Sequence, residues 1–150
     1  MRELVPKVDV WVTDWPRTHI DQHRFDYTSL CALRPDIIYA HATGFGPKGP
    51  DRDLPALDEL AAARTGMMPI LPQPGQPPVY ADAGQMYASV MLALGTVIAL
   101  HHRAATGEGQ EVDASLFAAN MYGASLDVQA FLAMGGDRFL HPVARLDAGN

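Results

Sequence analysis

The sequence is poor in cysteine, and this low content indicates the redox state of the compartment in which the protein is expected. Its 150 residues include a single cysteine, Cys31, so an internal disulfide is excluded. A lone thiol in the apolar run 30–33 is best interpreted as a small core residue of a protein from a reducing compartment, and we expect a cytoplasmic location. The first residues lack a basic segment followed by an apolar core, so no signal peptide is expected.

The chain also lacks an excess of positive charge. Its formal net charge is −6 at pH 7. A general nucleic-acid surface needs a basic patch to meet phosphates, so nucleic acid is not an expected partner. Hydrophobic residues make up 48% of the sequence and charged residues 19%, which is typical of a globular domain rather than a disordered chain.

Several common chemical motifs are absent as well. No Gly-Lys-Ser/Thr stands where a phosphate-binding P-loop would need it, and no Gly-x-Ser-x-Gly elbow supports a serine hydrolase. His19 and His23 are four residues apart but have no evident third ligand, so no metal site is expected. The apolar run 84–100 is shorter than the about 20 residues of a membrane span and contains polar positions, so a buried helix is favoured and no membrane contact is expected.

Strand and helix patterns alternate in the first part of the chain. Residues 8–13 alternate and are rich in β-branched side chains, 27–33 read as a helix, and 37–40 form a short apolar strand. After a loop, residues 57–65 predict a short alanine-rich helix that ends at Gly66. Strand, helix and strand in this order favour a parallel α/β unit.

A proline-rich segment follows that helix. Residues 69–78 contain five prolines and are therefore not expected to form a regular helix or a central strand. A rigid spacer is the favoured interpretation, and a polyproline ligand for another protein is the alternative.

The segment 84–116 is the most informative part of the sequence. Large apolar residues recur on nearly every face of 86–100, which predicts a helix that is buried on all sides. A basic end at 101–103 and a glycine-rich turn at 106–110 would close this helix.

A further helix is expected after the glycine-rich turn. Residues 111–113 predict a short extended link. Either Asp113 or Ser115 could then cap a helix that runs through Tyr122.

Three segments in a fixed order carry a family resemblance. The first is VDVWVTDW at 8–15, the second is RPDIIY at 34–39 followed by TGFGPKGP at 43–50, and the third is TGEGQEVD at 106–113. They are similar to the ADVLVENF, NPRLIY...GFGQTGP and TGRGQ-VDV patterns of the family III CoA-transferases. This CaiB/BaiF type of protein also includes the alpha-methylacyl-CoA racemases.

The resemblance implies a fold and an assembly. The fold would be α/β, the Rossmann-like large-domain portion of the family III CoA-transferase fold, with a long buried helix. Residues 1–134 would form a partial large domain and 135–150 a linker toward a second domain, because family members are longer and the sequence resembles their central portion. Family members form interlocked homodimers, so a homodimer or a complementing chain is the expected partner.

The resemblance also implies a reaction. Family members move CoA between an acyl-CoA thioester and a small carboxylic acid through an enzyme aspartate, and the CoA thioester is a substrate rather than a permanently bound cofactor. Without a gap, the family's Gly-Asp pair matches Gly84-Gln85, and a carboxamide is not a nucleophile for this reaction. Asp82 lies three residues before Gln85 and is the preferred catalytic residue, with a helix N-cap as its alternative role.

Positions that match the family's CoA contacts cluster after the first strand. Asp14 and Trp15 match an Asn-Phe pair, and Trp15 would stack on adenine unless it belongs to the core. Arg17 and Arg24 would bind phosphate oxygens, and the alternative is that both are ordinary solvated charges.

Three further candidates lie near the middle of the chain. Gly44 and Phe45 begin a Gly/Pro loop whose backbone could approach the ligand closely. Asp58 could be a pocket carboxylate or a solvent-facing acid in the first turn of its helix.

Three functions are compatible with these features. A CoA-transferase that uses Asp82 is the preferred hypothesis, and a noncatalytic CoA-binding or assembly fragment is the alternative that Gln85 favours. An acyl-CoA racemase is a weaker alternative. The string Ala81-Asp82-Ala83-Gly84 supports it, but Leu57 stands where the racemase branch has its second acid/base, a histidine.

Overall fold

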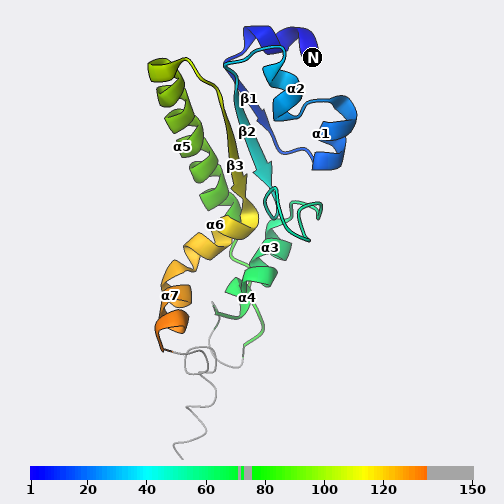
Figure 1. Cartoon of the computed structure of the whole chain (residues 1–150). Coiled ribbons are helices and arrows are strands. Elements are labelled where there is room, and N and C mark those ends of the chain that lie inside the picture. The colour runs from blue at the N-terminus through cyan, green and yellow to red at the C-terminus, as the bar shows by residue number, and fades with distance from the viewer. Residues whose placement is uncertain (71, 73–75, 135–150) are drawn as a thin grey trace, which may run out of the picture.

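A parallel three-stranded sheet forms the centre of the computed structural model, which describes residues 1–70, 72 and 76–134 (Figure 1). The strands lie in the order β1-β2-β3, and both neighbouring pairs are parallel. The middle strand is the most buried, as its two neighbours require. The mixed α/β fold and the strands expected from the sequence are therefore confirmed, with bounds β1 (Val10–Thr13), β2 (Ile38–Thr43) and β3 (Gln110–Ser115).

Helices connect the strands and lie on both faces of the sheet. Their bounds are η1 (Arg2–Lys7), α1 (Arg17–His23), α2 (Tyr27–Cys31), α3 (Asp58–Thr65), α4 (Met67–Ile70), α5 (Ala83–Thr106), α6 (Leu116–Gly123) and α7 (Ser125–Met134). In Figure 1, α1 and α2 lie on one side of the sheet and α5 on the other. On the first side, a core of buried apolar residues joins η1, the link between α1 and α2, α2 itself and the start of β2: Val5, Phe25, Leu30, Ile37 and Tyr39.

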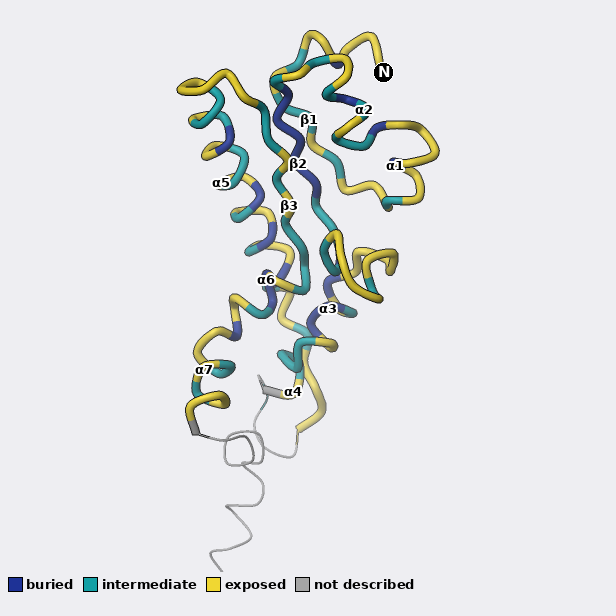
Figure 2. The backbone as a smooth tube through the Cα atoms, viewed as in Figure 1, coloured by how far each residue is buried: buried dark blue, intermediate teal, exposed yellow. Residues whose placement is uncertain are grey.

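The prediction that α5 is buried on all sides is wrong for this chain. Only one stripe of the helix is buried, and it faces the sheet and α6: Gly84, Ala88, Leu92 and Ala99. Several large side chains on its other faces are more than half exposed: Met86, Val90, Leu94, Val97 and Ile98. Figure 2 shows this alternation of buried and exposed turns along the helix. The physical reason is that one sheet can cover only one stripe of a helix.

The length and composition of α5 are also those of a membrane span. It is the one helix among the described residues that is long and apolar enough to cross a bilayer. Core helices of water-soluble proteins meet the same criterion, so this property alone gives weak support for a membrane role. The packing of α5 on the sheet accounts for its buried stripe without a bilayer.

Helix ends follow the predicted signals in most places. Gly66 and Gly107 adopt left-handed conformations, with φ of 76° and 80°, and end α3 and α5 as expected. Of the two predicted caps for α6, the structure uses Ser115, whose hydroxyl accepts a 3.1 Å hydrogen bond from the backbone N–H of Ala118.

The proline-rich segment departs in part from its prediction. Its first two residues, 69–70, complete the single turn α4, although no regular helix was expected there. Pro69 is tolerated because it stands in the first turn, where a helix has no intrahelical partner for the N–H that proline lacks. Residues 71 and 73–75 and the predicted linker 135–150 lie outside the described residues.

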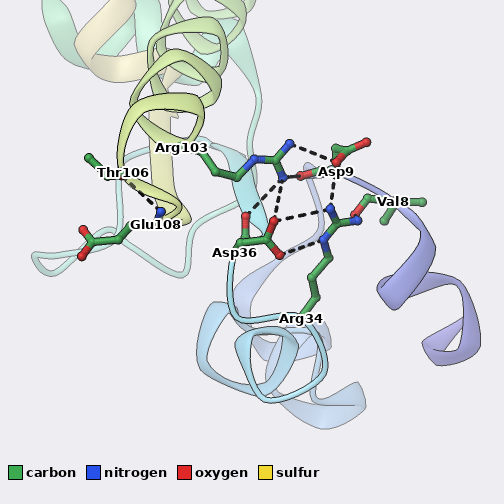
Figure 3. Close-up of polar contacts among 7 residues, drawn as sticks. All are labelled: Val8, Asp9, Arg34, Asp36, Arg103, Thr106 and Glu108. Atoms are coloured by element: carbon green, nitrogen blue, oxygen red, sulfur yellow. Dashed lines mark hydrogen bonds and ion pairs between the residues drawn. The ribbon is translucent and has the colours of Figure 1, made fainter.

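A cluster of four charged residues closes the amino-terminal edge of the sheet (Figure 3). Arg34 lies 2.8 Å from Asp9 and 3.0 Å from Asp36, and Arg103 on α5 lies 2.9 Å from Asp9. Arg103 also donates to the main-chain carbonyls of Asp9 and Asp36. The hydrogen bond from Arg34 holds the pKa of Asp36 below its ordinary value. The cluster therefore fixes the last turn of α5 to the starts of β1 and β2.

Candidate functional site

The opposite, carboxyl edge of the sheet collects the candidate residues. Parallel strands end at the same edge, so Asp14 follows β1 there and Gly44 follows β2. Because the last turn of α5 is fixed at the amino edge through Arg103, its first turn lies toward the carboxyl edge (Figure 1). Asp82 directly precedes that first turn. Ligand sites of open parallel sheets commonly lie at this edge.

Asp82 stands at the N-cap position of α5 without capping the helix. Its backbone is left-handed, with φ 45° and ψ 35°, and its side chain makes no capping hydrogen bond. Asp82 is exposed, and its Oδ1 accepts a 3.0 Å hydrogen bond from the hydroxyl of Tyr80. A left-handed conformation raises the conformational energy of a residue with a β-carbon, so contacts with the surrounding structure must stabilise the Asp82 backbone. The Asp82 carboxylate therefore lies beside the N-terminus of α5 without forming a hydrogen bond to the backbone N–H groups of the helix.

Asp58 takes over the capping role from another helix. It is 6% exposed, so the interpretation as a solvent-facing acid is wrong. Its Oδ2 accepts a hydrogen bond of 3.2 Å from the N–H of Gln85, and its Oδ1 accepts one of 2.8 Å from the Asn120 side chain. The reason for its burial is that the first turn of α3 is packed between α5 and α6. Both carboxylate oxygens therefore already have partners within the chain.

The hydroxyl of Tyr80 links the two carboxylates. It lies 3.0 Å from Oδ2 of Asp58 and 3.0 Å from Oδ1 of Asp82. One hydroxyl proton can be donated to only one of these oxygens at a time. Burial raises the pKa of Tyr80, and the two hydrogen bonds raise it further, so the hydroxyl stays protonated at neutral pH. Sequence reasoning missed Tyr80, because a lone tyrosine beside a proline-rich segment carries no signal.

Gln85, the ungapped match to the family aspartate, is exposed and lies in the first turn of α5. Its backbone N–H is taken by Asp58. Its side chain is a carboxamide, which cannot form the acyl anhydride that a carboxylate can form. Of the two candidate positions, only Asp82 combines exposure with the required chemistry.

Trp15 belongs to an aromatic cluster just after β1. Its ring lies 6.2 Å from that of His19, 6.1 Å from that of His23 and 6.2 Å from that of Phe25. It remains 38% exposed, so part of the ring is available to a ligand. The core and stacking interpretations are thus both compatible with its position.

The charged candidates around Trp15 differ in their surroundings. Asp14 is exposed, and Arg17 is the first residue of α1. Arg24 ends α1 with φ 54°, and its carbonyl accepts a 3.3 Å hydrogen bond from the guanidinium of Arg2. No ion pair within 4.0 Å involves Arg17 or Arg24 among the described residues. Phosphate binding by these arginines stays a prediction.

A buried histidine positions the turn that carries Trp15. His41 on β2 is 2% exposed, and its Nε2 donates a 3.0 Å hydrogen bond to the Trp15 carbonyl. Its Nδ1 lies 3.7 Å from Oδ1 of Asp113 on β3. Burial lowers the pKa of His41 below the ordinary 6.5, so the ring is neutral at pH 7. Sequence reasoning missed His41, which stands alone in an apolar strand.

Gly44 and Phe45 pack within the chain. A β-carbon at Gly44 would lie 3.0 Å from the Pro55 carbonyl, and the Gly44 carbonyl accepts a 2.9 Å hydrogen bond from Phe117. The Phe45 ring lies 6.0 Å from that of Phe117. The observed role of both residues is to join the loop after β2 to α6, and contact with CoA stays a prediction.

A small recess adjoins Asp82. It lies between α3, α4 and the start of α5 and has room for little more than a single water molecule, and its border includes Ala62, Met67, Met68, Val79, Tyr80 and Asp82. A hydrogen bond of 3.0 Å from Val79 to the Met68 carbonyl holds two of its walls together. The described residues contain no group of three or more potential metal ligands, here or elsewhere.

Comparisons with known proteins agree with this architecture. The family model described as CoA-transferase family III matches residues 1–144. The chain is similar to a CAIB/BAIF family protein from Brucella suis, with a TM-score of 0.84 and 28% identity over 91% of this chain and 36% of that one. A Mycobacterium tuberculosis protein has a TM-score of 0.81 over 89% of this chain and 38% of that one, but at 24% identity it supports the fold alone.

Curated relatives are named as CoA-transferases. The chain is 35% identical to cinnamoyl-CoA:phenyllactate CoA-transferase from Clostridium sporogenes over 87% of its length. It is 32% identical to (R)-2-hydroxy-4-methylpentanoate CoA-transferase from Clostridioides difficile over 82% of its length. In both cases it spans 32% of the relative. Fold, motifs and family match agree, and the chain belongs to CoA-transferase family III.

Proposed function

We propose that the protein transfers CoA between an acyl-CoA thioester and a carboxylic acid, with Asp82 as the carboxylate that carries the transferred groups. Membership of the family supports the reaction class. The observation that carries the assignment of Asp82 is its exposed carboxylate at the N-terminus of α5, held by the Tyr80 hydroxyl beside the recess.

The chemistry follows from an ionised carboxylate. An oxygen of Asp82 attacks the thioester carbonyl, the C–S bond breaks, and CoA leaves as a thiolate while a mixed anhydride forms. The thiolate then attacks Cγ of Asp82, which releases the first carboxylic acid and leaves an Asp82–CoA thioester. An incoming carboxylate attacks that thioester, and the returning thiolate takes its acyl group, so Asp82 is regenerated and no proton is consumed.

The surrounding groups suit these steps. The positive end of the α5 dipole favours both the ionised Asp82 and the oxyanion that develops at the attacked carbonyl. When the Tyr80 hydroxyl donates to Asp82 rather than to Asp58, it restricts the rotation of the Asp82 carboxylate. Asp58 caps α5 in place of Asp82, so the backbone N–H groups of the helix do not occupy the reactive carboxylate.

Other features of the working protein are proposals of the same kind. The aromatic face of Trp15 with Arg17 and Arg24 would receive the nucleotide end of CoA. The exposed apolar side of α5 supports a homodimer or a complementing chain, because soluble proteins rarely leave such a surface open. The single cysteine supports a cytoplasmic location.

Trapping of the covalent intermediate tests the proposal. The protein is incubated with an acyl-CoA and reduced with borohydride, and the modified peptide is mapped by mass spectrometry. Modification at Asp82 that disappears in Asp82→Asn, and persists in the exposed-acid control Glu59→Gln, is the expected result. Modification at another residue, or activity that survives Asp82→Asn, would refute the assignment.

A second candidate is a noncatalytic CoA-binding fragment, which Gln85 at the ungapped family position favours. It predicts CoA binding that Asp82→Asn leaves unchanged, with no trapped adduct in a folded sample. The racemase hypothesis predicts exchange of solvent deuterium at the α-carbon of an acyl-CoA, and Leu57 in place of a histidine counts against it.

A further inference from the structure

Two side chains of the sheet hold the backbone of Trp15 from both sides. The Thr13 hydroxyl accepts a 3.2 Å hydrogen bond from the Trp15 N–H, and Nε2 of His41 donates a 3.0 Å hydrogen bond to the Trp15 carbonyl. A carbonyl oxygen can only accept, so Nε2 carries a proton of the ring. Thr13 on β1 and His41 on β2 are cross-strand partners in the parallel ladder. One level of the sheet therefore fixes both polar backbone groups of Trp15.

His41 and Trp15 differ in their exposure. The His41 ring is 2% exposed and lies 6.2 Å from the ring of Tyr39 on the same strand. Trp15 is 38% exposed and belongs to the segment 14–16, which links β1 to α1. The hydrogen bond thus ties an exposed aromatic residue to the buried middle strand. A segment that is already ordered loses less conformational entropy when it binds a ligand.

We propose that His41 is a positioning residue for the binding of CoA, because it holds the segment 14–16 in the conformation in which the Trp15 ring can stack on adenine. This inference rests on the proposed function, which places the nucleotide end of CoA at Trp15. Without the hydrogen bond the segment would occupy this conformation for a smaller fraction of the time, and the apparent Kd rises in inverse proportion to that fraction. The thioester lies at the other end of CoA, so His41 should affect binding and not the chemical step.

Titration calorimetry with two ligands tests this role. The ligands are coenzyme A and adenosine 3′,5′-bisphosphate, which is the nucleotide end of CoA alone. His41→Leu removes the donor and should weaken the binding of both ligands by the same factor, about tenfold. His41→Gln keeps a side-chain N–H and should restore most of the lost affinity. Where transfer is measured, His41→Leu should raise KM for the acyl-CoA and leave kcat unchanged, which a general loss of structure would not do.

A second variant tests the same segment independently of His41. Thr13→Val removes the other hydrogen bond to Trp15 with little change of shape, and it should weaken the binding of both ligands about threefold. It decides the matter should His41→Leu fail to fold. Thr96→Val removes a threonine hydroxyl from α5, on the other side of the sheet, and is the matched control that should bind both ligands as wild type does (Figure 1).

Trp15→Ala separates this inference from the proposed function. If Trp15→Ala weakens binding but the His41 and Thr13 variants do not, the role of His41 is refuted and the nucleotide site at Trp15 is supported. If Trp15→Ala binds as wild type does, or if the wild-type chain binds neither ligand, both are refuted. Calorimetry requires no reaction, so a failure of Asp82 to form an adduct would overturn the transferase proposal without changing this result.

Discussion

The side-chain amide of Asn120 donates a 2.8 Å hydrogen bond to Oδ1 of Asp58, and both residues are buried. The same amide also donates to the carbonyl of Leu116 within α6. With the Gln85 N–H on its other oxygen, Asp58 connects α3, α5 and α6 at the carboxyl edge of the sheet. This connection places the start of α5, and Asp82 with it.

Removal of the Asn120 amide should destabilise the fold. Asn120→Leu leaves one oxygen of the buried Asp58 without its donor, and a buried polar group without a partner costs about 1–3 kcal/mol. The free energy of unfolding, measured with urea, should fall by this amount. Glu59→Gln, at an exposed position of the same helix as Asp58, should change it little. An Asn120→Leu variant as stable as wild type would contradict the connecting role of Asp58.

Gly84→Ala should destabilise the protein although alanine favours helices. A β-carbon at this position would collide with the Asn120 amide and the Asp58 carboxylate. Substitution of a helical glycine by alanine normally gains up to about 1 kcal/mol, whereas overpacking costs about 1–3 kcal/mol. Ser89→Ala, at an exposed position of the same helix, is the matched control. Stabilisation by Gly84→Ala would show that the contact is looser than the structure indicates.

Under the proposed function, Tyr80→Phe should reduce catalysis without preventing the binding of substrate. Asp82 would lose its hydroxyl partner, and one lost charge-assisted hydrogen bond corresponds to about a tenfold lower kcat. KM should change much less, since the ring and its contacts are kept. The control is Tyr122→Phe, which removes the hydroxyl of an exposed tyrosine. An unchanged kcat in Tyr80→Phe would mean that Asp82 needs no positioning by this hydroxyl.

The stability of the fold should decrease as the pH falls below about 6.5 because of His41. Burial lowers the pKa of His41 in the folded chain, so between that lowered pKa and the ordinary 6.5 the unfolded chain binds a proton that the folded chain does not. Each pH unit in this window should cost up to about 1.4 kcal/mol.

Urea unfolding at pH 7.5 and 5.5 measures this dependence. His41→Gln keeps a side-chain N–H that can bond the Trp15 carbonyl but cannot titrate, and it should flatten the pH dependence. The wild-type protein and His41→Gln share all other titrating groups. The difference between them in how the free energy of unfolding changes with pH therefore measures the contribution of His41. Equal slopes in the two proteins would exclude His41 as the source.

Local signals explain why much of the fold was predictable. The alternation in 8–13, the apolar run 37–40 and the caps at Gly66 and Ser115 are encoded by neighbouring residues, and the structure confirms them. The exposure of α5 was not predictable in the same way. An apolar sequence shows which side chains favour burial, but it does not show which surfaces are present to cover them.

The residues of the candidate site were likewise predictable only where the signal lay in neighbouring residues of the sequence. Asp82 could be proposed as the catalytic residue because it lies near a motif of fixed spacing. Tyr80, His41 and Asn120 were missed because their partners lie on other elements, and no short spacing reports such contacts. Asn120 did leave a signal that could have been used, since an asparagine within an otherwise apolar helix commonly has a buried hydrogen-bond partner.

The strand order has a consequence for the chain during its synthesis. β1 and β2 leave the ribosome close together and can pair early, but β3, the other neighbour of β2, follows only after α3, α4 and the whole of α5. Until then β2 presents one unpaired edge, and the apolar stripe of α5 has no complete sheet to cover it. Nascent chains interrupted before residue 110 should therefore depend on chaperones. Chains that extend past residue 115 contain β3 and can form the three-stranded sheet without that help.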